Sequence, residues 1–122
     1  MSMKYFISGT DTAMGKTLVG VALLHAARSA GHSAIGAKPV AAGCELIDGI
    51  WQNEDASALR AASSLELDYE QVNPIALKAF MAPHIAAERE GVALNAVDLC
   101  RKINALPDAK ITIIEGAGGW LV

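Results

Sequence analysis

A glycine-rich turn between two apolar segments constrains the fold of this 122-residue chain more than any other feature. A short β-prone run over residues 4–8 ends at Gly9, and Gly15-Lys16-Thr17 opens a segment rich in Ala, Leu and Val. In a strand, glycine turn and helix of this order, backbone N–H groups and the helix N-terminus can converge on phosphate oxygens. The pattern predicts a phosphate-binding loop in which Lys16 reaches the β- and γ-phosphates and the Thr17 hydroxyl binds Mg²⁺.

The spacing of this loop differs from the strict phosphate-loop pattern. Five residues separate Gly9 from Gly15, whereas the strict pattern has four and would require glycine at Thr10. The alternative is a glycine-rich turn that carries an incidental lysine. The strand before the turn and the helix after it favour the nucleotide-binding interpretation.

The remaining apolar segments predict strands and helices in alternation. We expect strands at residues 4–8, 33–37, 73–77 and 110–114, and helices at 17–30, 53–63, 83–89 and 96–106. Pro74 weakens the third strand because proline cannot donate to a sheet ladder. The order predicts an α/β fold, with a doubly wound, mostly parallel sheet, helices on both faces and 110–114 at its centre. We expect a single domain over residues 1–122, of the P-loop NTPase-like type.

Charged residues follow two of the predicted strands. Lys38 comes after the second strand and Glu115 after the last, so both lie at the sheet edge where ligands bind in such folds. Glu115 precedes four small residues, which favours a metal ligand that a close backbone can approach. Lys38 would neutralise a phosphate or a developing carboxylate, although a snorkelling surface lysine fits its spacing equally well. Asp55, at a helix start, is explained by the helix dipole alone.

Composition argues against several classes of function. The formal net charge is −3 and the basic residues are scattered, so we expect no nucleic-acid surface. No apolar run is long enough to span a bilayer, and the first residues lack a signal-peptide pattern. Cys44 and Cys100 lack metal-ligand spacing and indicate a reducing compartment, for which the cytoplasm is the default. Cys44 has no paired base and is not expected to be a nucleophile.

Ordered motifs along the chain resemble the dethiobiotin synthetases. The longer loop spacing is that family's own, and the motifs cover almost the whole chain. They are Gly9-Thr10-Asp11-Thr12-x-x-Gly15-Lys16-Thr17, Gly36-Ala37-Lys38-Pro39-Val40, Asn53-x-Asp55, Val72-Asn73-Pro74, Pro83-His84-x-Ala86-Ala87 and Glu115-Gly116-Ala117-Gly118-Gly119-Trp120.

The resemblance implies an ATP- and Mg²⁺-dependent ligase of biotin biosynthesis. Its substrates would be 7,8-diaminononanoate, CO₂ and ATP, and it would be a homodimer at full length. One amine is carboxylated to a carbamate, ATP phosphorylates the carbamate, and the second amine closes the ureido ring. The protein's task in such chemistry is mainly positioning and charge neutralisation.

The resemblance also implies roles for individual residues. Lys38 would be the catalytic lysine, together with Lys16. Substrate would contact Thr12, Lys38 and Ala42, and Mg²⁺ would lie among Thr17, Asp55 and Glu115. The nucleotide would contact Ala13, Met14, Gly15, Lys16, Thr17, Leu18, Asp55, Glu115, Gly116, Ala117 and Gly118. The family often has serine at the position of Ala42 and an acid at that of Ala13, so both contacts are altered here.

Other functions remain open from the residues alone. A related P-loop amidoligase of the cobyrinate-diamide-synthase type shares a similar loop, but Lys38-Pro39 and the spacing to Asp55 favour dethiobiotin synthetase. Partitioning-type ATPases usually carry a lysine early in the loop, where this chain has Thr10 to Thr12. Family members continue beyond Val122, so the chain is expected to be the N-terminal half of a longer domain. By itself it would bind ATP weakly and make no dethiobiotin.

Overall fold

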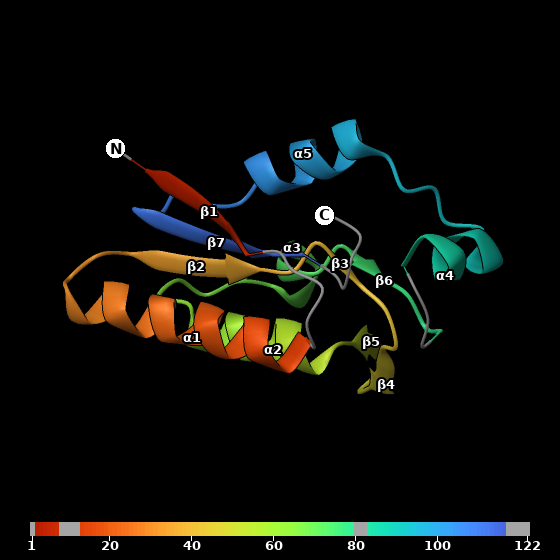
Figure 1. The fold of residues 1–122 in the computed structure, drawn as a ribbon, viewed down its shortest axis with the longest axis horizontal. Coiled ribbons are helices and arrows are strands. Elements are labelled where there is room, and N and C mark those ends of the chain that lie inside the picture. Colours follow the sequence, from red (N-terminus) through yellow and green to blue (C-terminus); the bar gives the residue numbers. More distant parts are fainter. Residues whose placement is uncertain (1, 8–12, 80–82, 117–122) are drawn as a thin grey trace.

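A three-stranded parallel sheet lies at the centre of the molecule (Figure 1). The computed structural model describes residues 2–7, 13–79 and 83–116, with the backbone alone at 13, 14, 83 and 84. The strands are β1 (Met3–Ile7), β2 (Ala34–Ala37) and β7 (Ile111–Glu115), in the order β1-β7-β2. The central position predicted for residues 110–114 is confirmed, and the strand bounds differ from the prediction by one residue.

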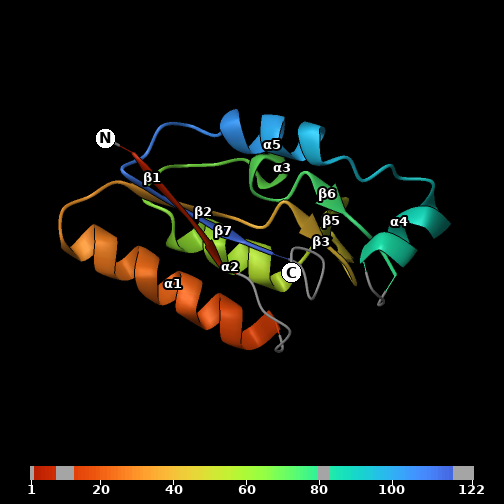
Figure 2. The same ribbon diagram turned by 45° about the horizontal axis from the view of Figure 1, so that its top comes forward.

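Helices cover both faces of this sheet (Figures 1 and 2). On one face lie α1 (Ala13–Ser29) and α2 (Glu54–Ala62), and on the other lies α5 (Ala96–Asn104). The core under α1 and α2 includes Leu24, Leu59 and Ile113, which are buried completely or nearly so. A Cβ on Gly36 of β2 would lie 2.9 Å from Leu24 Cδ1 and 3.2 Å from Leu59 Cβ, so a side chain there would force the packing of α1 and α2 on this strand to shift. The predicted α/β fold is confirmed.

The first turn of α1 contains the Gly-Lys-Thr sequence. The helix begins at Ala13, four residues before the predicted start at Thr17, so the helical backbone already includes Gly15 and Lys16. Their N–H groups therefore belong to the helix N-terminus, which carries partial positive charge. The end of α1 at Ser29 is within one residue of the prediction, and Gly31 follows with a positive φ of 84°.

A side-chain cap fixes the start of α2. Asn53 has extended backbone, and its side-chain oxygen accepts a hydrogen bond of 3.0 Å from the Ala56 N–H. The predicted helix over 53–63 is confirmed, with Asn53 and Ser63 as its two caps. The cap places Asp55 in the first turn of α2, close to the sheet edge that carries Lys38.

Several short elements between β2 and α5 were not predicted: β3 (Val40–Ala41), the hairpin of β4 (Glu45–Ile47) and β5 (Ile50–Gln52), and the single turn α3 (Tyr69–Val72). β3 pairs in parallel with β6 (Ile75–Ala76). Asp48 and Gly49 join the hairpin with φ of 51° and 80°, as a two-residue primed turn requires. The predicted strand 73–77 is correct only for 75–76, since Asn73 caps α3 and Pro74 follows it.

The last helices close a second core. α4 (Pro83–Glu90) and α5 pack Ala86, Ala87 and Leu99 against Val40 and Leu77. α5 ends at Asn104, two residues before the predicted end. Among the helices that the structure describes, none is long and apolar enough to cross a membrane.

Candidate active site

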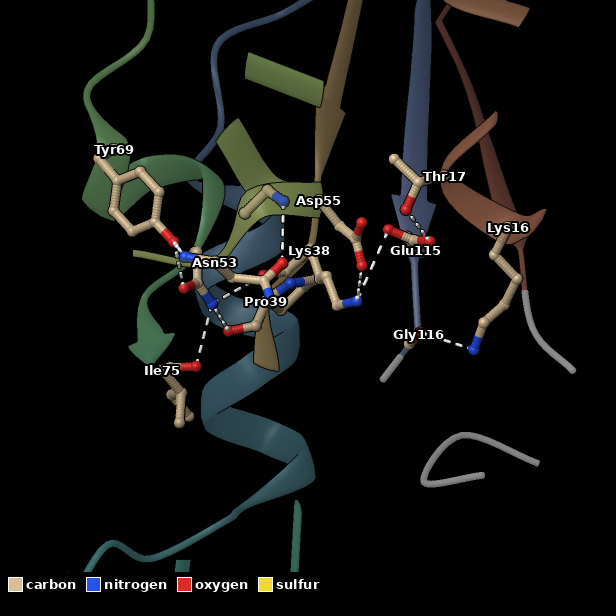
Figure 3. Close-up of polar contacts among 12 residues, drawn as sticks. Lys16, Thr17, Lys38, Pro39, Asn53, Asp55, Tyr69, Ile75, Glu115 and Gly116 are labelled. Atoms are coloured by element: carbon tan, nitrogen blue, oxygen red, sulfur yellow. Dashed lines mark hydrogen bonds and ion pairs between the residues drawn. The ribbon is translucent and has the colours of Figure 1, made fainter. Parts of the chain in front are cut away.

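Three chain segments bring charged side chains to one edge of the sheet (Figure 3). The register pairs Ile7 of β1 with Glu115 of β7, and Ala37 of β2 with Ile114. The strands therefore end together, with Lys38 directly after β2. Lys16 reaches the same edge from α1. Lys16, Lys38 and Glu115 therefore lie at one sheet edge, as the predicted topology required.

Glu115 is the most buried charged residue of this group. Its side chain is 0% exposed, and Oε1 accepts a hydrogen bond of 2.8 Å from the Thr17 hydroxyl. Oε2 lacks a hydrogen-bond partner among the described residues and lies 3.9 Å from Lys38 Nζ. Burial raises the pKa of Glu115 above its usual value, while Lys38 and the Thr17 hydrogen bond lower it. A buried oxygen without a donor is costly unless it has a role, and this one fits a cation ligand.

Lys38 lies between two carboxylates. Its side chain is 3% exposed, and its Nζ donates to Asp55 Oδ2 at 3.2 Å. This burial rules out the snorkelling surface lysine that the sequence left open. The ion pair also gives Asp55 a charged partner in addition to the helix dipole. A buried ammonium needs such pairing, because removing either partner leaves an uncompensated charge.

Lys16 connects α1 to the segment that follows β7. It is 6% exposed, and its Nζ donates to the Gly116 carbonyl at 3.1 Å. The Gly116 N–H donates to the Ile7 carbonyl at 2.9 Å. Gly116 thus joins the end of β1 to the lysine of the phosphate-binding motif, and the Lys16 ammonium lies at the sheet edge.

Thr17, Asp55 and Glu115 carry oxygen atoms of the kind that could hold a magnesium ion. Hydroxyl and carboxylate oxygens are the ligands that this ion prefers, and it retains waters for the rest of its shell. In residues 2–7, 13–79 and 83–116, no three His, Cys, Asp or Glu side chains form a metal-binding group. Thr17, Asp55 and Glu115 offer only oxygen atoms, without the nitrogen and sulfur ligands of a zinc site. A cation here would compete with Lys38 for the same two carboxylates.

The structure describes the other predicted contact residues to different extents. Gly15 lies in the first turn of α1, Leu18 is 66% exposed on that helix, and Ala42 is half-buried beside the core of Val40 and Leu77. Their contacts with ligands remain predictions. Ala13 and Met14 are described by backbone alone, and three predicted site residues lie outside the described residues: Thr12, Ala117 and Gly118.

Two buried polar residues next to Lys38 have no role in the sequence-based prediction. Tyr69 is 6% exposed and Asn73 is 2% exposed, and both hydrogen-bond within this region. Asn73 belongs to the Val-Asn-Pro motif, which was a signal that a polar side chain is needed there. No sequence pattern marks Tyr69, whose hydroxyl partners Asn53 and Asn73 lie 16 and 4 positions away along the chain.

We expect Cys44 to react slowly with thiol reagents. It is 5% exposed, its Sγ donates to the Ala41 carbonyl at 3.7 Å, and burial raises the pKa of its thiol. Cys100 is exposed on α5. At about pH 8, a disulfide reagent should label Cys100 at least ~100-fold faster than Cys44, as peptide mapping would show. Equal rates would instead identify Cys44 as an accessible, reactive thiol.

Comparisons with known proteins agree with this geometry. Residues 3–122 match the family described as AAA domain. The chain is 54% identical to ATP-dependent dethiobiotin synthetase BioD of Cellvibrio japonicus, over 100% of this chain and 54% of that protein. It is 51% identical to the protein of that name from Aromatoleum aromaticum, over 97% of this chain and 53% of that protein. The resemblance to dethiobiotin synthetases that the motifs predict is confirmed.

The chain spans about half the length of the curated relatives it matches. The family match nevertheless covers almost every residue of this chain, including the helix that carries Lys16 and the strand that ends at Glu115. The parallel sheet and the charged strand ends are the arrangement that a nucleotide-binding domain needs. This chain therefore belongs to the AAA domain family.

Proposed function

We propose that this chain provides the ATP- and magnesium-binding part of a dethiobiotin synthetase. The reaction would form the ureido ring of dethiobiotin from 7,8-diaminononanoate, CO₂ and ATP. The observation that carries the proposal is the cluster of two buried lysines, one hydroxyl and two carboxylates at one sheet edge. The names of the relatives at about half identity supply the substrate class.

The proposed reaction has three bond-forming steps. First, one amine of the substrate attacks CO₂ and loses a proton, which gives a carbamate. A carbamate oxygen then attacks the γ-phosphorus of ATP, releasing ADP and leaving a carbamic–phosphoric anhydride. Finally, the second amine attacks the carbonyl carbon, the bond to phosphate breaks, and a proton leaves as the ring closes. Negative charge on the carbamate and on the transferred phosphoryl group must be neutralised throughout.

The two buried lysines would neutralise negative charge on different parts of the reacting groups. Lys16, at the N-terminal turn of α1, would hold the β- and γ-phosphates together with the backbone N–H groups of that turn. Lys38 would face the carbamate and the γ-phosphate from the end of β2, because Asp55 and Glu115 direct its ammonium toward the same edge. Bound Mg²⁺, held by Thr17, Asp55 and Glu115, would supply further positive charge to the phosphates.

Asp55→Asn and Glu115→Gln should each raise the magnesium concentration that half-saturates activity. Each change removes one negative charge from the proposed ligand set, and we expect a shift on the order of tenfold. The measurement is a Mg²⁺ titration of turnover in the complete gene product at fixed ATP. Glu66→Gln, the same change at an exposed residue outside the site, is the matched control. Titrations that coincide with wild type for both variants would remove these residues from the magnesium site.

The remaining proposals concern assembly and location. We propose a homodimer at full length, in the cytoplasm, with no nucleic-acid partner. Support comes from the resemblance, from the net charge of −3 and from two cysteines that form no disulfide with each other. Light scattering on the complete gene product tests the dimer, and a monomeric mass at working concentration would contradict it.

A further inference from the structure

A buried chain of hydrogen bonds connects Lys38 to Asp55 by a second route, apart from their ion pair (Figure 3). The Tyr69 hydroxyl accepts a bond of 2.6 Å from the Asn53 N–H and donates one of 2.8 Å to Asn73 Oδ1. The Asn73 side-chain amide donates a hydrogen bond of 2.9 Å to the carbonyl of Lys38. Tyr69 and Asn73 thus join the cap of α2 to the main chain of Lys38.

The connection closes into a ring. Asn53 caps α2, whose first turn carries Asp55, and Asp55 accepts from the Lys38 ammonium at 3.2 Å. The Lys38 N–H also donates to the Val72 carbonyl at 2.9 Å. Both main-chain polar groups of Lys38 are therefore held by residues 72–73. The position of its ammonium is set from the backbone as well as from the carboxylates.

The geometry leaves the Asn73 amide one orientation. Its Nδ2 lies 2.9 Å from the Lys38 carbonyl, 3.3 Å from that of Pro39 and 3.0 Å from that of Ile75. Three carbonyl acceptors on one side require the NH₂ group there, so Oδ1 faces the Tyr69 hydroxyl. Burial raises the pKa of Tyr69 above its usual value, so the hydroxyl stays protonated and donates at neutral pH. A fully paired buried network of this kind is rigid.

We propose that Tyr69 and Asn73 are positioning residues that set where the Lys38 ammonium lies relative to Asp55 and Glu115. Neither residue extends to the charged cluster itself. They act through the main chain of Lys38 and the start of α2. The effect on turnover rests on the proposed function, whereas the effect on the Lys38 side chain does not.

Two substitutions separate this role from simple packing. Tyr69 also packs in the core with Ile35 and Val72, and Tyr69→Phe keeps that ring while removing only the hydroxyl. Asn73→Asp keeps an acceptor for Tyr69 but turns a carboxylate oxygen toward three carbonyls. The matched controls are Tyr5→Phe, at an exposed tyrosine, and Asn95→Asp, where the side chain only accepts bonds, from the N–H groups of Val97 and Asp98.

The first readout needs no substrate. The complete gene product is treated with a small amine-acylating reagent, and mass spectrometry measures the labelling rates of Lys38 and Lys16. Lys38 should be labelled at least ~5-fold faster relative to Lys16 in Tyr69→Phe and in Asn73→Asp, because the loosened ammonium reaches the reagent more often. The two controls should keep the wild-type ratio.

The second readout divides binding from turnover. In Tyr69→Phe, kcat for dethiobiotin should fall about tenfold, while the Kd for ATP stays within about twofold of wild type. If wild type makes no dethiobiotin, the proposed function is contradicted. If Lys38 is nevertheless labelled selectively in the two variants, the positioning role still holds. A wild-type labelling ratio in Tyr69→Phe would overturn the positioning role, even if Asn73→Asp fails to fold. So would equal acceleration at Lys16 and Lys38 with a lower melting temperature, which marks general loosening.

Discussion

Replacement of Lys16 by alanine is expected to remove most ATP binding from the complete gene product and nearly all of its turnover. The Lys16 ammonium lies at the sheet edge, 3.1 Å from the Gly116 carbonyl, on the helix turn that faces the proposed phosphate site. It would make charge-assisted hydrogen bonds to two phosphates. Their loss should weaken ATP binding on the order of 100-fold, or ~2.7 kcal/mol.

Isothermal titration calorimetry with a non-hydrolysable ATP analogue measures this loss. Lys102→Ala removes a lysine from the exposed face of α5 and is the matched control for the change in net charge. Its affinity for the analogue should equal that of wild type. An unchanged affinity in Lys16→Ala would mean that the Gly-Lys-Thr turn does not hold the nucleotide.

Replacement of Lys38 by alanine should slow ring closure far more than it weakens ATP binding. Its ammonium is buried between Asp55 and Glu115, at the end of β2 rather than on α1. We expect kcat to fall on the order of 1000-fold, the scale of losing one group that stabilises developing charge. The Kd for ATP should change only about threefold. Lys38→Arg should not restore the rate, because a forked guanidinium does not replace a compact ammonium in a closed site.

Single-turnover experiments with saturating ATP separate these effects. Quenched samples give the rates of phosphate release and of dethiobiotin formation, and calorimetry on the same variant gives the affinity for ATP. Lys78→Ala is the control, since that lysine lies over the Trp51 ring on the exposed surface. Equal losses of nucleotide binding and turnover in Lys38→Ala would place Lys38 with the nucleotide.

The sheet and its charged edge could be predicted because both follow from strong local patterns. Residues 110–114 are a continuous apolar run, which indicates a strand buried on both faces. Parallel topology then places the residues after each strand on one edge, so Lys38 and Glu115 had to lie near the Gly-Lys-Thr turn. The cap at Asn53 was also visible, since asparagine before an acidic first turn favours a helix start.

Other features depend on contacts that no local pattern shows. The strands of the hairpin have three residues each, too few for alternation to stand out, although the Asp48-Gly49 pair does favour a turn. Whether Lys38 was buried depended on α2 and β7, which lie elsewhere in the sequence. The hydrogen bond from Asn73 to the Lys38 carbonyl spans 35 positions of the chain, so the positioning ring emerges only in three dimensions.

We propose that the charged sheet edge of this chain serves an ATP-driven ring closure. This role is tested most directly by incubating the complete gene product with ATP, Mg²⁺, 7,8-diaminononanoate and radiolabelled bicarbonate. We predict labelled dethiobiotin and inorganic phosphate in equal amounts, with neither formed when the diamine is left out. Phosphate release at the same rate with and without the diamine, and no labelled product, would contradict the account and identify an ATPase of another kind.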